Sequence, residues 1–64
     1  MTRDLTQAQL DKKCKQYGFK PTGFLSYYDV GYGLHVCALN AGTRRRSQLA
    51  YLIEERNKAE KRNG

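Results

Sequence analysis

The sequence predicts a small single α+β domain with the order helix, strand, strand, helix, in which one antiparallel β-hairpin packs on two helices. Three observations lead to this prediction. The chain has 64 residues, the size of one small domain. Its two ends carry apolar residues at helical spacing. Between them lie two runs rich in aromatic and β-branched residues, separated by glycines, which are typical of paired strands. We therefore expect residues 1–64 to form one domain.

The first predicted helix covers residues 7–17. Thr6 and Gln9 have the spacing of a capping box, in which each side chain binds the backbone N–H of the other residue. Gly18 is suited to the left-handed position that ends many helices. The apolar stripe of this helix consists of Leu10, Cys14 and Tyr17.

The residue pattern in the middle of the chain predicts a turn at residues 20–23. It then predicts a hairpin with strands over residues 24–30 and 34–39. A two-residue loop at Gly31 and Tyr32 gives two apolar faces. One face then holds Leu25, Tyr27, Val36 and Ala38, and the other holds Phe24, Tyr28, His35, Cys37 and Leu39. A longer loop is the alternative, and a shift of one residue moves every side chain to the opposite face.

The second predicted helix covers residues 44–61, with Thr43 as its N-cap and residues 62–64 as a frayed tail. Its inner stripe consists of Leu49, Leu52, Ile53 and Arg56. Glu54 and Lys58 have the spacing of a favourable ion pair on one helix face. The alternative is a helix that begins at Ser47, which would leave the preceding arginines in a loop.

Composition and cysteine usage narrow the function classes. The formal net charge is +6, and no apolar run reaches the length of a membrane span. The first residues do not form a signal peptide, so we expect a cytoplasmic protein. Cys14 and Cys37 are predicted to be reduced, and their spacing is not that of a metal site. His35 and Cys37 share a strand face, but nothing accompanies them as a third catalytic group. We therefore expect no enzyme, no metal and no cofactor.

The run Arg44, Arg45, Arg46 is the feature that indicates a binding function. If Thr43 caps the helix, the arginines surround backbone N–H groups that have no helical partner. Such groups, together with guanidiniums, bind phosphate or carboxylate. Gly42 would let a ligand approach the backbone closely. We predict that these arginines matter more for binding than for folding; the alternative is that Arg45 and Arg46 pair with a carboxylate such as Asp29.

Two further residues extend the predicted anion site along the second helix. On a helix that begins at Arg44, Tyr51 points away from the apolar stripe and lies roughly in line with Lys58. Arginines with an interleaved tyrosine are typical of surfaces that bind single-stranded nucleic acid or an RNA backbone.

The segment from Ala41 to Arg46 also resembles the final part of double-stranded-RNA-binding domains, which place basic residues at a helix start against phosphates. The resemblance covers only the hairpin strand and the basic helix start that follows it. Those domains have three strands, whereas the sequence predicts two, and the loop that enters the minor groove has no recognisable counterpart here.

Two functions follow from these observations. The first is a small basic protein without enzymatic activity that contacts nucleic-acid phosphates through the arginine-rich helix start. The second is a protein-interaction module or small inhibitor that uses its tyrosine-rich apolar hairpin, with a homodimer as one form of it. The interface residues expected for the second function are Phe24, Tyr28 and Leu39.

Overall fold

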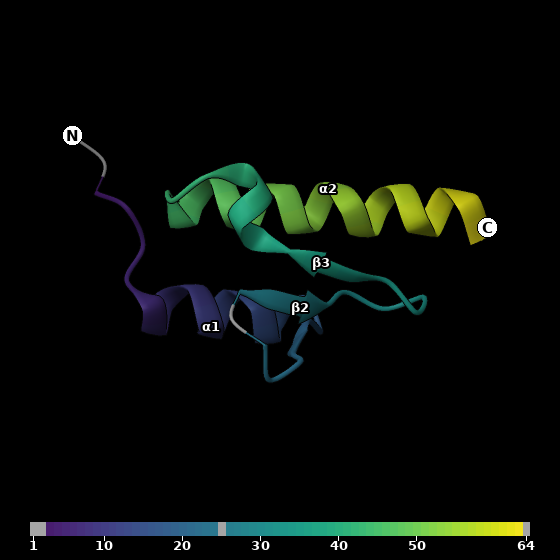
Figure 1. The fold of residues 1–64 in the computed structure, drawn as a ribbon, viewed down its shortest axis with the longest axis horizontal. Helices are drawn as coiled ribbons and strands as arrows, with labels where there is room; N and C mark the ends of the chain where they lie inside the picture. The colour runs from purple at the N-terminus through teal and green to yellow at the C-terminus, as the bar shows by residue number, and fades with distance from the viewer. Residues whose placement is uncertain (1–2, 25, 64) are drawn as a thin grey trace.

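The computed structural model describes residues 3–24 and 26–63, and it has the predicted α+β architecture (Figure 1). Its elements are α1 (Gln7–Gln16), β1 (Lys20–Pro21), β2 (Tyr27–Asp29), β3 (His35–Cys37), the 3-10 helix η1 (Ala38–Ala41) and α2 (Arg45–Asn63). The three strands form an antiparallel sheet in the order β1-β2-β3. Strand β1 and helix η1 are absent from the sequence-based prediction, which has two strands.

Helix α1 begins at the predicted residue and ends at Gln16, one residue earlier than predicted. The Gln9 N–H donates to Thr6 Oγ1 at 3.1 Å, and the Thr6 N–H donates to Gln9 Oε1 at 2.9 Å. After the helix, Gly18 has a φ of 81°, and the Phe19 N–H donates to the Cys14 carbonyl at 2.8 Å. This pair of helix signals therefore worked as the sequence indicated.

The hairpin register corrects the prediction by one residue. Tyr28 lies opposite Val36, and the Val30 N–H donates to the Leu34 carbonyl at 3.1 Å. The loop therefore has three residues, Gly31, Tyr32 and Gly33, all with positive φ. Two glycines make this backbone accessible, and the Asp29 carboxylate accepts the Gly31 N–H at 2.9 Å. The two-residue loop is wrong, and the two predicted faces are therefore wrong as well.

Both strands of the hairpin are shorter than predicted. Ser26 has a φ of 61°, which interrupts extended backbone before Tyr27. Phe24 consequently lies in the turn between β1 and β2 rather than in a strand. The Thr22 N–H donates to the Tyr27 carbonyl at 3.2 Å, and this contact continues the pairing of β1 with β2. Leu25, which the prediction placed on a strand face, lies outside the described residues.

The core lies between the sheet and the two helices. Tyr28 and Val36 face it from β2 and β3, and the helices contribute mainly Leu10, Cys14 and Leu52. Leu49, Ile53 and Tyr51 pack against it from α2 while remaining partly exposed. Within the described part of the chain, neither helix combines the length and apolarity needed to cross a membrane.

Helix α2 begins one residue later than predicted. The Arg44 carbonyl accepts the first helical hydrogen bond, from the Gln48 N–H at 3.0 Å, so Thr43 is not the N-cap. The buried Gln48 side chain donates to the Gly42 carbonyl at 2.8 Å and thereby ties the start of the helix to the preceding turn. At the other end, residues 62 and 63 are helical rather than frayed, and Gly64 lies outside the described residues.

Candidate anion-binding site

The start of α2 lies against the N-terminal segment of the chain. The Arg45 N–H donates to Asp4 Oδ2 and the Arg46 N–H donates to Asp4 Oδ1, each at 3.0 Å. These two backbone hydrogen bonds hold the pKa of the Asp4 carboxyl below its ordinary value, because they favour the charged form. Asp4 therefore occupies two of the N–H groups that the sequence-based prediction left open for an external anion.

The three arginines have different surroundings. Arg45 is half-buried, and it donates through Nη1 to the Leu5 carbonyl at 3.3 Å and through Nε to Gln7 Oε1 at 3.4 Å. Arg46 is exposed, and its Nε donates to the Arg3 carbonyl at 2.9 Å. The Arg44 guanidinium is exposed and makes no hydrogen bond or ion pair with any residue the structure describes. Arg45 and Arg46 thus hold the N-terminal segment, Arg46 through Nε alone, so Arg44 and the exposed end of Arg46 are available to a ligand.

A surface hollow of about 320 Å³ marks this end of the molecule. It is lined by Asp4, Arg44, Arg46 and Ser47. Arginine suits a phosphate or carboxylate, because its guanidinium presents N–H donors in a planar fork. We call these four residues the basic hollow.

Gly42 and Thr43 form the connection that precedes α2. Gly42 has a φ of 96°, its N–H donates to the Leu39 carbonyl at 2.9 Å, and its own carbonyl accepts from Gln48. Thr43 is exposed, and its hydroxyl makes no hydrogen bond with the described residues. These two residues therefore shape the turn that presents Arg44.

The structure does not bring Tyr51 and Lys58 to the basic hollow. Tyr51 packs against the core and lines a different hollow together with Tyr27 and His35, so the expectation that it points away from the apolar stripe is wrong. Lys58 pairs with Glu54 at 3.6 Å, as predicted. It lies about three and a half helical turns beyond Arg45, too far along α2 to share a ligand group with it.

The predicted hairpin interface is present only in part. Phe24 is 78% exposed and Leu39 is 47% exposed, whereas Tyr28 is only 7% exposed. The burial of Tyr28 follows from the one-residue change in register, which places it opposite Val36 on the core side. Tyr28 is therefore a core residue and is removed from the interface prediction.

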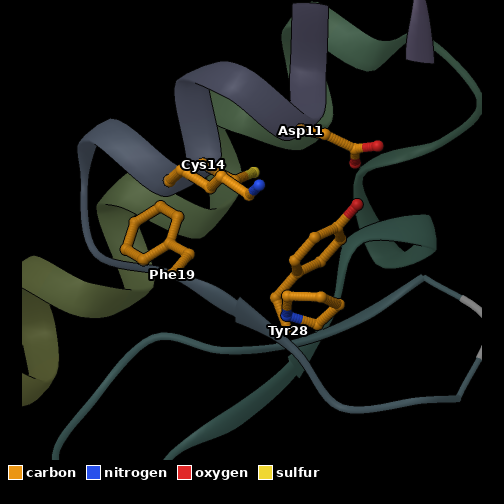
Figure 2. Close-up of a pocket in the computed structure, with 6 residues that line it drawn as sticks. Asp11, Cys14, Phe19 and Tyr28 are labelled. Carbon is orange, nitrogen blue, oxygen red and sulfur yellow. The ribbon is translucent and has the colours of Figure 1, made fainter. Parts of the chain in front are cut away.

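The pocket around Tyr28, lined in part by the exposed Asp11 and Lys15, brings a thiol, a phenol and a carboxylate close together (Figure 2). The Tyr28 hydroxyl points toward the Asp11 carboxylate, and burial raises the pKa of Tyr28. Burial also raises the pKa of the Cys14 thiol to about 11, so this thiol is protonated at neutral pH. Cys14 and Cys37 are free thiols, as predicted. The properties of Cys14 are those of a packed core side chain rather than of a nucleophile.

Two titratable groups of the hairpin form a cross-strand pair. His35 Nε2 lies 4.0 Å from Asp29 Oδ2, on the neighbouring strand. Asp29 therefore contacts His35 and Gly31, and it is not the carboxylate that Arg45 and Arg46 meet. Among residues 3–24 and 26–63, no group of three or more His, Cys, Asp or Glu side chains is arranged to hold a metal ion.

Comparison of the chain with protein-family models, curated proteins and solved structures finds no match. The site is therefore defined by its geometry alone. Sequence reasoning found the arginine run but missed Asp4, because the contact joins residues 41 positions apart and no local spacing indicates it.

Proposed function

We propose that this protein binds nucleic acid and that Arg44 and Arg46 contact the phosphate backbone. The observation that carries the proposal is the Arg44 guanidinium, which is exposed at the basic hollow without a partner among the described residues. The net charge of +6 supports it, because a polyanion gains by neutralising clustered cations and releasing counterions.

The ligand contacts in this proposal come from side chains rather than from the helix backbone. Asp4 occupies the Arg45 and Arg46 N–H groups, so a phosphate is held by the guanidiniums at the rim of the hollow. Arg45 acts as a positioning residue, since its side chain is committed to Leu5 and Gln7. Contacts of this kind do not read bases, and the binding we expect is sequence-independent and sensitive to salt.

Double-stranded RNA belongs among the ligands to be tested. The resemblance of residues 41–46 to double-stranded-RNA-binding domains came with two differences, the expected number of strands and the missing counterpart of the loop that enters the minor groove. The structure has three antiparallel strands, so the first difference no longer applies, whereas the second one stands. Such domains recognise duplex shape and phosphates rather than sequence.

The test is a salt titration of binding to DNA and RNA probes by the parent protein and by an Arg44→Gln variant. We expect the variant to bind more weakly and to lose about 0.7–0.9 of the slope of log affinity against log salt, the value of one phosphate contact. Arg62→Gln is the matched control, because it removes the same exposed side chain near the opposite end of α2. Equal slopes for the two variants and the parent would exclude Arg44 as a phosphate contact.

A protein-interaction function is the second candidate, and the exposure of Phe24 and Leu39 favours it. The Ala38 N–H donates to the Ser26 carbonyl at 2.7 Å, which brings η1 next to the turn that carries Phe24. Self-association through this surface is one form of the proposal. Sedimentation equilibrium at low and high salt tests for this self-association. An apolar contact between two copies weakens little as salt rises, whereas phosphate binding weakens steeply.

A further inference from the structure

The outer face of the sheet carries exposed aromatic side chains that the arginine site does not use. Strand alternation places Tyr27 and His35 on this face, opposite to the core residues Tyr28 and Val36. Tyr27 is 44% exposed, and Phe24, on the turn just before β2, is 78% exposed. Aromatic rings that are this exposed and lie together on one face are more typical of a binding surface than of the ordinary surface of a monomer.

Two adjoining hollows follow these rings. The first, of about 500 Å³, is lined by Thr22, Phe24, Tyr27 and His35, and its size is within the usual range of small-ligand sites. The second, of about 300 Å³, shares Tyr27 and His35 with the first and continues to Tyr51. We name Phe24, Tyr27, His35 and Tyr51 the aromatic track.

The turn that carries Phe24 is held by side-chain contacts. The Thr22 hydroxyl donates to the Tyr27 carbonyl and accepts the Phe24 N–H, each at 3.3 Å. These contacts fix the backbone of Phe24 relative to Tyr27. A surface that is arranged before binding loses less conformational freedom when a ligand arrives.

We propose that the aromatic track binds unpaired bases of single-stranded nucleic acid, with Phe24 and Tyr27 stacking on them. The inference rests on the proposed nucleic-acid binding and adds a strand class to it. Aromatic side chains stack on any base, and bases in a duplex are not available for such contacts. The polar groups beside the rings are His35, Thr22, Asn40 and the carboxylates of Asp29 and Glu55, which suit base edges rather than phosphates.

Charge favours a nucleic acid over a second copy of this chain as the occupant. A second copy carries the same net charge of +6 as a whole, and like charges oppose association. A single strand brings negative charge together with flat apolar rings. Lys20 is exposed and lies opposite Asp29 in the sheet, so a cation stands at the β1 side of the track for the backbone of the strand.

The experiment compares three probes: a labelled oligouridine, an RNA duplex of the same length, and heparin. We expect Phe24→Ala and Tyr27→Thr to weaken oligouridine binding about tenfold each and to leave heparin binding unchanged. Tyr32→Ala is the control, because it removes a ring that is 55% exposed at the hairpin tip, outside both hollows. We expect Phe24→Trp to bind oligouridine like the parent, and because the parent has no tryptophan, a bound base quenches the fluorescence of this single tryptophan.

The outcomes separate this inference from the proposed function. If Phe24→Ala and Tyr27→Thr, folded by circular dichroism, bind oligouridine as the parent does, the aromatic track is not a base site, whatever Arg44→Gln does. If Arg44→Gln binds every probe like the parent while Phe24→Ala is selectively weak, the arginine proposal fails and the track remains. If Phe24→Ala changes only the sedimentation of the protein, the face is a dimer surface and the inference is overturned.

Discussion

Arg44 and Arg45 are neighbours in the sequence, yet the structure predicts that replacement by alanine affects binding at Arg44 and folding stability at Arg45. Both replacements remove one cation from the positive end of α2, so this electrostatic effect cancels when the two variants are compared. Only Arg45→Ala also removes the hydrogen bonds to Leu5 and Gln7. We therefore expect Arg45→Ala to be the less stable variant and Arg44→Ala to be the weaker binder.

The difference in stability follows from the two hydrogen bonds. Each is long, at 3.3 and 3.4 Å, and one of them is exposed, so each belongs at the low end of the usual 0.5–1.5 kcal/mol. The expected difference is about 1 kcal/mol, which is about 4–8 °C in Tm for a domain of this size. Thermal unfolding followed by circular dichroism measures it. Equal Tm values for Arg44→Ala and Arg45→Ala would refute the positioning role of Arg45.

Three further predictions concern the ends of the helices and the core. Because the pKa of Asp4 is lowered in the folded state, its contribution to stability is complete above the ordinary pKa of 3.8 and is lost as the pH falls through the folded value; an acid titration should show less pH dependence for Asp4→Asn than for the parent. Cys14→Ala should lower the free energy of unfolding by about 1 kcal/mol in urea and leave nucleic-acid binding unchanged, since the thiol is buried and protonated. Gly18→Ala should cost about 1 kcal/mol by thermal unfolding; a Cβ at this site meets no atom within 4 Å, so a φ of 81° is the whole cause, and an unchanged Tm would contradict it.

Local signals predicted most of α1. The capping box at Thr6 and the glycine at position 18 act within one helical turn, so the sequence contains every group that takes part. The pairing register of β2 and β3 was not predictable in the same way. Loops of two or three residues both suit the glycines around Tyr32, and burial of Tyr28 against α1 selects between them only in the folded chain. The choice of loop then decided which aromatic residues are exposed.

The arginine run shows a second limit of reading function from sequence. Side chains on a helix are rotated by about 100° from one residue to the next, so three consecutive arginines cannot all meet the same partner. At the start of α2 this rotation directs Arg45 to Leu5 and Gln7 and Arg46 to Arg3, while Arg44, just before the helix, remains exposed. The Asp4 carboxylate takes the helix N–H groups that would otherwise attract an external anion. The charge available for binding is therefore set by what the N-terminal segment leaves unused, and changes at Asp4 should alter anion binding as well as stability.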